Sequence, residues 1–560
     1  MKLSGLLFAA ALLGSCTQPA AEENYTRHVD PKIGTGGHGH VFVGANVPFG
    51  LVQVGPTSIP QTWDWCSGYH ASDSTVIGFS HTHLSGTGIG DLFDITVMPV
   101  VGEVTYARGE ENDPASGLWS YADRTREITK PGYYSVPLVR YGITAELTAT
   151  ERVGLHRYTF PASDAAAVVF DLENGGCWDK ATDTGFRFSD DSTRIAGWRC
   201  STGWAKNQEV YFVAEFSKPA KGISYLQPGE IDDSKMPRIA ARYARVDFDT
   251  AEGEQVLVKV ALSPVSIEGA KANLAAELPG WDFDATAAAA DKAWNDELSK
   301  VKIETEDETS KRIFYTALYH TMVAPSLFCD VNGDYRGADG KVHENPGRDT
   351  YTTFSLWDTY RAAMPLMTVL HPERMPDIIQ TMLHISDEQG RLPVWHLWGN
   401  ETDCMVGNPG IVAVADAIVK GIGGFDREKA FETIRKTAMN PDRGNGLRME
   451  YGYIPCEMFN EAVAYDMEYA LADGAAARAA EALGKAEDAK YFEERSHSYR
   501  NYFDPQTGFM RGRDSKKGWR TPFNAFASTH RADDYCEGNA WQYTWLAPHD
   551  VKGLEGLFGS

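Results

Sequence analysis

The sequence has 560 residues, which is too long for one ordinary hydrophobic core, so we expect two or more domains. Its composition is that of a globular protein, with 43% hydrophobic and 23% charged residues. The formal net charge is -24, from 53 Lys and Arg against 77 Asp and Glu. This charge argues against nucleic acid, which requires a clustered basic face, and it disfavours polyanionic glycans. The charge does not argue against neutral substrates.

The first sixteen residues have the pattern of a bacterial lipoprotein signal. Lys2 supplies the positive start, and residues 3–13 form an apolar stretch too short to span a bilayer. Leu13-Gly14-Ser15-Cys16 then follows as a lipobox, whose cysteine would accept diacylglycerol and attach the protein to a membrane. A plain signal peptide is the alternative. We expect export to the periplasm or to the outer surface of a Gram-negative cell.

Residues 17–280 are predicted to form a β-sandwich domain. Short alternating runs recur between Gly, Pro and Asp turns, which is typical of many short strands in two packed sheets. The clearest runs cover residues 134–141, 167–172, 210–216 and 255–262.

The chain changes near residue 285 to Ala-rich amphipathic segments with helical spacing. Strands first and helices later indicate separate β and α domains rather than an α/β layer fold. We expect a helical linker over residues 281–305 and a helical toroid over residues 306–560. A long helix is predicted at residues 460–483, because Gly484 is a helix-stop signal. Shorter helices are predicted at residues 376–388, 410–422, 427–439 and 487–502.

Metal-ligand patterns in the sequence are weak. Seven cysteines follow Cys16 without a C-x-x-C pair, so a zinc knuckle is not expected; most should be buried free thiols, with room for one or two bridges whose pairing the spacing does not give. The His38/His40 and His81/His83 pairs could ligate a metal from a strand, bind sugar hydroxyls, or serve the structure. The glycine run at residues 34–39 lacks the lysine of a phosphate-binding loop.

Several acidic residues fall on predicted connections. Hydrolysis of a glycosidic bond requires one carboxylic acid that protonates the leaving oxygen and a second carboxylate that activates water or attacks the anomeric carbon. Glu537 is the best acid candidate, because the aromatic residues after it predict low polarity, which favours the protonated form. Helix capping is the alternative for Glu537. Asp358 could bind sugar hydroxyls or pair with Arg361, and Asn400 and Glu401 suit a pocket rim.

Seven strings of unusual composition fall between the periodic segments. They are Asp30-Pro-Lys-Ile-Gly-Thr-Gly-Gly37, Pro48-Phe-Gly50, Cys66-Ser-Gly-Tyr-His70, Gly78-Phe-Ser-His-Thr-His-Leu-Ser-Gly-Thr-Gly88, Phe354-Ser-Leu-Trp-Asp-Thr-Tyr-Arg361, Gly399-Asn-Glu-Thr402 and Glu537-Gly-Asn-Ala-Trp-Gln-Tyr543. Together they resemble glycoside hydrolase family 92, the calcium-dependent exo-acting α-mannosidases. The resemblance runs from about Asp30 to the last residue.

The resemblance implies an N-terminal β-sandwich packed on an (α/α)6 barrel, and cleavage of terminal α-mannose from N-glycans or mannans with inversion at the anomeric carbon. Glu537 matches the family's general acid. The positions that match the subsite of the cleaved mannose are Trp357, Asp358, Asn400 and Glu401. Trp63 or Trp65 is expected to contribute from the sandwich. Ca²⁺ is the expected cofactor, because a hard cation can hold vicinal hydroxyls and distort the ring.

Family members continue past the last residue here with two strings that the resemblance ties to calcium, the leaving sugar and the general base. Neither string occurs in this sequence. We therefore expect the metal ligands and the general base outside it, and an incomplete barrel with about eight of twelve helices. Such a barrel exposes an apolar seam. These 560 residues alone are expected to bind mannose poorly, not to hydrolyse it, and to aggregate.

Two other functions stay open. The first is another toroid glycosidase or a glycoside phosphorylase with a similar sandwich. The second is a non-catalytic glycan-binding lipoprotein, which keeps an aromatic pocket without paired carboxylates. The sequence predicts neither the linkage preference nor the oligomeric state.

Overall fold

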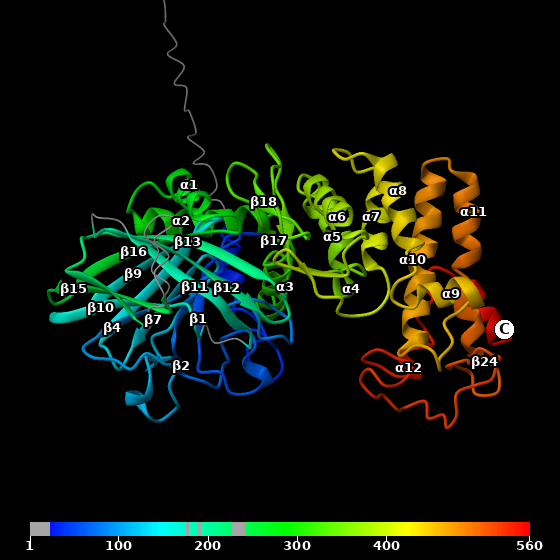
Figure 1. Cartoon of the computed structure of the whole chain (residues 1–560), viewed down its shortest axis with the longest axis horizontal. Coiled ribbons are helices and arrows are strands. Elements are labelled where there is room, and N and C mark those ends of the chain that lie inside the picture. Colours follow the sequence, from blue (N-terminus) through cyan, green and yellow to red (C-terminus); the bar gives the residue numbers. More distant parts are fainter. Residues whose placement is uncertain (1–22, 175–177, 189–191, 227–240, 560) are drawn as a thin grey trace, which may run out of the picture.

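The computed structural model describes residues 23–174, 178–188, 192–226 and 241–559. The predicted lipoprotein signal with Cys16 lies outside the described residues, as does Cys177. The chain passes from a strand-rich part to a row of helices, and the C-terminus lies at the far end of the helical part (Figure 1). Among the described residues, no helix combines the length and the apolar character that a membrane crossing requires.

The strand-rich part contains two antiparallel sheets. In spatial order, the six-stranded sheet consists of β1 (Gly55–Thr57), β3 (Gly78–Ser80), β4 (Thr96–Val101), β10 (Ser163–Asp171), β15 (Tyr243–Thr250) and β14 (Gly222–Leu226). The eight-stranded sheet consists of β11 (Lys180–Phe188), β12 (Arg194–Thr202), β13 (Gln208–Phe216), β16 (Glu254–Ser263), β9 (Val153–Phe160), β8 (Ile143–Ala149), β7 (Tyr133–Leu138) and β6 (Ile128–Lys130).

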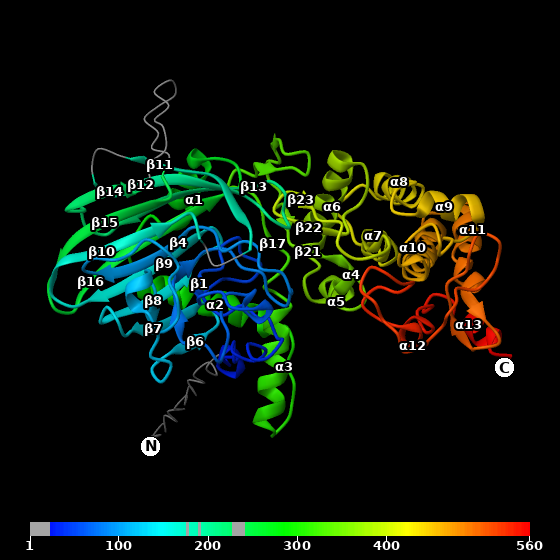
Figure 2. The same ribbon diagram turned by 60° about the horizontal axis from the view of Figure 1, so that its bottom comes forward.

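The two sheets pack face to face, as the alternating runs predict. Phe170 of β10 lies 5.9 Å from Phe212 of β13 between ring centroids, and Phe248 of β15 lies 5.8 Å from Phe216 of β13. These four rings are buried. Figure 2 shows the strands of the two sheets stacked in layers at one end of the molecule. The predicted β-sandwich is confirmed.

The helical part follows directly. Its helices and those at the sandwich are α1 (Ile267–Glu277), α2 (Phe283–Leu298), α3 (Glu308–His320), α4 (Leu356–Thr359), α5 (Ala363–Leu370), α6 (Met375–Gln389), α7 (Pro409–Val419), α8 (Arg427–Ala438), α9 (Asn445–Tyr451), α10 (Ala462–Ala482), α11 (Ala486–Arg495), α12 (Ala540–Tyr543) and α13 (Val551–Leu557). The predicted long Ala-rich helix is α10, which packs against α7, α8 and α11 (Figure 1). Its small alanines permit this close packing, and 16 of its 21 residues are buried.

Two of the strings predicted on connections form single helical turns. Trp357 and Asp358 lie on α4, and residues 540–543 form α12. The six described cysteines are free thiols: Cys66, Cys200, Cys329, Cys404, Cys456 and Cys536.

Side chains from both parts hold the sandwich and the helices together. The indole rings of Trp204 and Trp395 lie 4.6 Å apart between centroids. The Ser263 hydroxyl, at the end of β16, donates to the buried carboxylate of Asp330 at 2.8 Å. The Trp204–Trp395 contact places the hairpin β22–β23 (Trp395–Leu397 and Asn400–Glu401) against the sandwich.

Candidate active site

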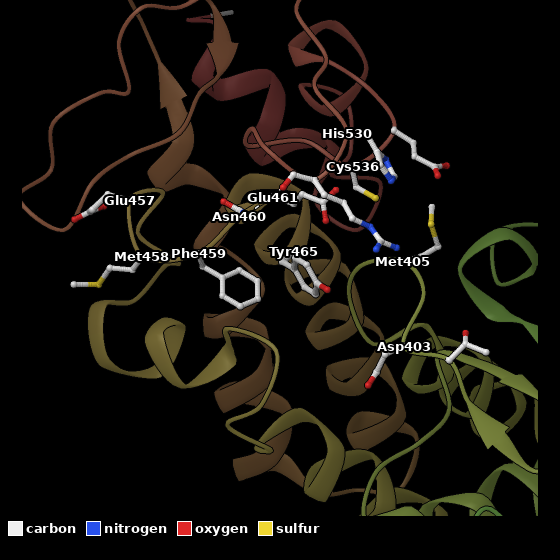
Figure 3. Close-up of a pocket in the computed structure, with 13 residues that line it drawn as sticks. Asp403, Met405, Glu457, Met458, Phe459, Asn460, Glu461, Tyr465, His530 and Cys536 are labelled. Atoms are coloured by element: carbon white, nitrogen blue, oxygen red, sulfur yellow. Dashed lines mark hydrogen bonds between the residues drawn. The ribbon is translucent and has the colours of Figure 1, made fainter. Parts of the chain in front are cut away.

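A cavity of about 680 Å³ opens between three segments of the helical part (Figure 3). The segments are the loop after β23, the chain that leads into α10, and the loop before α12. The lining residues are Thr402, Asp403, Met405, Glu457, Met458, Phe459, Asn460, Glu461, Tyr465, His530, Arg531, Cys536 and Glu537. Its volume falls in the range of roughly 300–1,000 Å³ that small-molecule sites occupy.

Glu537 borders a second cavity as well. This neighbour has a volume of about 200 Å³ and is lined by Trp357, Arg361, Cys536, Glu537, Gly538, Gln542, Tyr543 and Leu546. Cys536 and Glu537 therefore lie where the two cavities meet. A carboxyl group at such a junction can reach the bond that joins two parts of a ligand when one part lies in each cavity.

The backbone of the larger cavity is unusually strained. Sixteen non-glycine residues in the described parts of the chain have positive φ, and five of them belong to this wall of thirteen residues. The five are Asp403, Met405, Glu461, Arg531 and Glu537. A side chain in this conformation costs on the order of 1–3 kcal/mol and persists only where the surroundings impose it. Such concentration is typical of a functional site.

The surroundings of Glu537 differ from the prediction in one respect. Its side chain is exposed, so the expected low-polarity environment is wrong. The aromatic residues that follow point elsewhere: Trp541 packs on Phe509 and Trp545 on Phe558. The capping alternative is also wrong, because Asn539 caps α12 through a capping box with Gln542.

Cys404 shows that Asp358 and Glu537 belong to one region. Burial raises the pKa of its thiol most strongly; Arg531 then lowers the pKa, and the carboxylates of Glu537 and Asp358 raise it further. The three charged groups therefore all act electrostatically on the same thiol. The Ser355 hydroxyl donates to Asp358, and the predicted alternative of an ion pair with Arg361 does not form.

Arg361 and Trp357 are held instead by Glu468 of α10. The indole N–H of Trp357 donates to the Glu468 carboxylate at 3.1 Å, the hydroxyl of Tyr360 at 2.7 Å, and the guanidinium of Arg361 at 2.6 Å. Glu468 is buried, which raises its pKa, and the charge of Arg361 partly offsets this effect. Glu468 thus fixes the wall of the smaller cavity.

Asn400 and Glu401 serve the scaffold in this structure, and neither lines the two cavities at Glu537. The amide of Asn400 exchanges hydrogen bonds of 3.0 and 3.1 Å with the backbone of Asn207 in the sandwich. The carboxylate of Glu401 accepts the backbone N–H groups of Val394, Trp395 and Asp403 at 2.8–3.0 Å. Their polar atoms thus have protein partners in this structure, and the expectation that both side chains line the mannose subsite stays a prediction.

The two tryptophans of the sandwich also lie outside these cavities. Trp63 is half-exposed and donates its indole N–H to the carbonyl of Gly88 at 2.8 Å. Trp65 stacks on His70 at 4.3 Å and donates to Asp73. Of the pair, Trp63 keeps the more accessible ring.

Two family models match the chain, one over the strand-rich part and one over the helical part. Residues 28–263 match the family model described as the glycosyl hydrolase family 92 N-terminal domain, and residues 269–560 match the one described as its catalytic domain. The chain belongs to glycosyl hydrolase family 92. The resemblance read from the seven strings is confirmed.

Solved structures of family 92 share the fold. A family GH92 α-mannosidase from Bacteroides thetaiotaomicron, solved in complex with mannoimidazole, is 39% identical with a TM-score of 0.91, over 96% of this chain and 72% of that one. An inverting GH92 mannosidase from the same species is 28% identical with a TM-score of 0.84, over 97% of this chain and 73% of that one. An uncharacterized secreted glycosidase from Arthroderma benhamiae is 25% identical and covers 99% of this chain, which spans 74% of its length.

The His81/His83 pair of this family 92 chain has no nitrogen available for a metal. The Nδ1 atom of His81 donates to the carbonyl of Ile95 at 2.6 Å, and its Nε2 atom lies 2.9 Å from Nε2 of His156. For His83, Nδ1 donates to the carbonyl of Gln53 and Nε2 pairs with the Ser80 hydroxyl. In the other pair, His38 contacts Asp64 at 2.5 Å and His40 is buried 3.5 Å from the same carboxylate.

The calcium that the resemblance implies does not fit the described side chains that come closest to a metal site. Within the described residues, Glu297, His371 and Glu373 bring ligand atoms within 4.8 Å of one another. The ammonium group of Lys300 already lies 2.7 Å from Glu297 and 2.9 Å from Glu373. Calcium prefers six to eight oxygen ligands, so a set with an imidazole and a resident cation does not suit it.

Sequence reasoning missed Glu461, Glu468 and Arg531. Glu468 left a signal, because it interrupts the apolar face of an Ala-rich helix. Glu461 directly precedes the same helix and reads as an ordinary helix start. Arg531 lies in a loop without periodicity, so no local pattern distinguishes it.

Proposed function

We propose that this protein is an exo-acting α-mannosidase that removes terminal α-linked mannose from glycans with inversion at the anomeric carbon. The relatives named as α-mannosidase and inverting mannosidase support this activity, as does their coverage of nearly the whole chain. The observation that carries it is the place of Glu537 at the junction of two cavities in the helical part.

Glu537 acts as the general acid in this proposal. Its exposed carboxyl group protonates the glycosidic oxygen, while the cleaved mannose lies against Trp357 in the smaller cavity. Asp358, the next residue on α4, is proposed as a further ligand of the same sugar. The rest of the glycan then extends toward the larger cavity. Inversion requires a second carboxylate roughly 6.5–9.5 Å from the first, which leaves space for the attacking water. We assign no general base within these 560 residues.

Further parts of the proposal rest on the sequence and the relatives. Trp63 is proposed to meet the sugar from the sandwich through its exposed ring. Calcium is proposed as the cofactor on the resemblance alone, and no step is assigned to it. Export is proposed from the N-terminal pattern, supported by the relative named as a secreted glycosidase. Lipidation at Cys16, with a periplasmic or outer-membrane location, is the finer form of that proposal.

The test is product analysis with the full-length protein and α-linked mannobioses. The expected result is release of mannose without added phosphate, with the β-anomer as the first product seen by proton NMR. Release of α-mannose as the first product would refute inversion, and a requirement for phosphate would indicate a phosphorylase. Binding without any release would indicate a glycan-capture protein.

A further inference from the structure

The loop between β23 and α7 touches the walls of both cavities. Asp403 and Met405 in this loop line the larger cavity (Figure 3). Two residues further on, Gly407 packs against Glu468, which holds the wall of the smaller cavity. A Cβ atom at Gly407 would lie only 2.4 Å from that of Glu468. The shape of both cavities therefore depends on where residues 403–407 lie.

Residues 403–407 receive little support from their own backbone. Within the described part of the chain, the carbonyls of Met405 and Gly407 accept from no backbone N–H group. Asp403 and Met405 also have φ values of 55° and 76°, in the left-handed region that residues other than glycine rarely adopt. A backbone in this conformation persists only where its surroundings impose it. The loop therefore needs support from another part of the chain.

Arg443 provides this support through one guanidinium group. Its Nη1 atom donates to the carbonyl of Gly407 at 2.6 Å, and its Nη2 atom donates to the carbonyl of Met405 at 2.5 Å. Its Nε atom lies 3.4 Å from Oδ1 of Asp403. The guanidinium is planar and its five N–H donors have fixed directions, so contacts with three alternate residues define the course of the loop.

Arg443 is itself anchored to α10. Its side chain is only 10% exposed, and its guanidinium lies over the ring of Tyr465, 5.2 Å from the centroid. Its backbone carbonyl accepts the hydroxyl of Tyr469 at 2.9 Å. Tyr465 and Tyr469 lie about one helical turn apart on α10, and Tyr465 lines the larger cavity. Arg443 thus joins the loop to the long helix, although it lines neither cavity itself.

Arg336 shows that the same chemistry can serve the fold alone. Its side chain is also 10% exposed, and its guanidinium donates to the carbonyls of Pro264 and Gly340 at 3.0 and 3.1 Å. It pairs with Glu209 at 3.0 Å. None of these partners lines either cavity. Arg443 differs because the groups that it holds form part of a cavity wall.

We propose that Arg443 is a positioning residue of this hydrolase: by fixing residues 403–407, it keeps the larger cavity in the shape that binds the part of the glycan beyond the cleaved bond. Arg443 touches no substrate in this proposal, and its effect passes through Asp403 and Met405. The inference rests on the proposed function, in which the cleaved mannose occupies the smaller cavity and the rest of the glycan the larger one. It follows that Arg443 determines the preference for long over short mannosides.

The test compares two substrates of the full-length protein: an α-linked mannotriose, which reaches the larger cavity, and methyl α-mannoside, which does not. Arg443→Met keeps most of the length of the side chain and removes every donor. Its kcat/KM for the trisaccharide is expected to fall by about 10- to 100-fold, mainly through KM, because the sugars beyond the cleaved bond lose their fitted wall. For methyl α-mannoside it should stay within about threefold of the wild type. The ratio of the two constants does not depend on the folded fraction, so a loss of stability alone leaves it unchanged.

Two further variants complete the comparison. Arg443→Lys keeps the charge but cannot bind both carbonyls in the fixed directions of a guanidinium, so its ratio should fall by an intermediate factor. It also takes the place of Arg443→Met if that variant does not fold. Arg336→Met is the matched control, which should lower the melting temperature and leave the ratio within about twofold of the wild type.

An unchanged ratio in both Arg443 variants would overturn the inference, as would an equal change in Arg336→Met. In either case the wild type still cleaves both substrates, so the proposed function stands. If the wild type releases mannose from neither substrate, the proposed function fails and this inference fails with it.

Discussion

The Arg199 cluster of the sandwich and the wall of the larger cavity treat their polar side chains in opposite ways. In the sandwich, the guanidinium of Arg199 is buried and pairs with Asp94 at 2.7 Å and Asp179 at 2.9 Å, and the His81 ring has a partner at each nitrogen. At the cavity, Glu461 keeps a buried oxygen without a partner and Glu537 is exposed. The Arg199 cluster thus neutralises its buried charges internally, whereas Glu461 leaves one carboxylate oxygen without a partner.

This difference distinguishes structural from functional polar groups. A buried group whose partners all lie in the protein contributes to stability and has nothing left to offer a ligand. A group that stays unpaired on a strained backbone costs stability and keeps its hydrogen-bonding capacity. Substitutions in the two regions should therefore separate into losses of activity and losses of stability.

The largest expected effect is on catalysis, at Glu537. Glu537→Gln keeps the shape and removes the transferable proton, so kcat should fall by about 10³-fold. Because the side chain is exposed, the melting temperature should stay unchanged. Steady-state kinetics with an α-mannoside and thermal melting of the full-length protein measure both. Turnover within about tenfold of the wild type would remove Glu537 from the role of general acid.

The second prediction concerns the sandwich, where a substitution should lower stability and leave catalysis unchanged. Arg199→Met leaves two buried carboxylates without their cation and should cost about 3–5 kcal/mol of unfolding free energy. The folded fraction should keep the kinetic constants of the wild type. Arg126→Met is the matched control, because Arg126 pairs with Asp123 at 2.8 Å while 69% exposed, and should cost less than about 1 kcal/mol. If urea unfolding gave the same loss of unfolding free energy for both variants, burial of the Arg199 ion pairs would not explain their contribution to stability.

Glu468 lies between these cases, because it is internally paired but holds a wall of the smaller cavity. Glu468→Gln loses the charge that Arg361 meets, and its one amide oxygen can replace either Oε1, which accepts from Trp357, or Oε2, which accepts from Tyr360, but not both. Since Arg361 is 41% exposed, the stability loss should be only about 1–2 kcal/mol. KM for an α-mannoside should rise several-fold with kcat nearly constant, and tryptophan fluorescence should report a more mobile Trp357. A loss of stability with unchanged KM would make Glu468 purely structural.

The sequence predicted the periodic elements well, because strands and helices are encoded by neighbouring residues. The long helix predicted at residues 460–483 is α10 at Ala462–Ala482. It did not predict which polar side chains find partners far along the chain. Glu468 meets Trp357 across 111 positions, and Asn400 meets Asn207 across 193. No local pattern records such a pair.

The environment of Glu537 was mispredicted for a related reason. Counting the aromatic residues after it ignores the direction in which each ring points. Trp541 reaches Phe509 on a different hairpin, and Tyr543 turns inward and donates its hydroxyl to the carbonyl of Cys536 at 2.7 Å. Composition predicts that aromatic rings are near in sequence, whereas only the fold decides which groups they cover.

The smallest expected effect is a pH dependence whose sign differs between the two regions. Burial lowers the pKa of His81 to about 4 and that of His83 to about 3, against about 6.5 in an unfolded chain. Between these values the unfolded chain binds protons that the folded sandwich does not, so stability is lost as the pH falls. From pH 7 to pH 6 the loss is about 0.7 kcal/mol per histidine.

Asp534, in the loop of Glu537, should respond in the other direction. Burial raises the pKa of its carboxyl group to about 6, so its contribution to stability is present at low pH and is lost as the pH rises through 6. Hydrogen exchange at pH 7 and pH 6, corrected for intrinsic rates, can compare β9 and β16 with residues 530–537. Protection should fall in the strands and hold or rise in the loop. If protection fell in both the strands and the loop, the buried histidines of the sandwich and Asp534 would not change stability with pH in opposite directions.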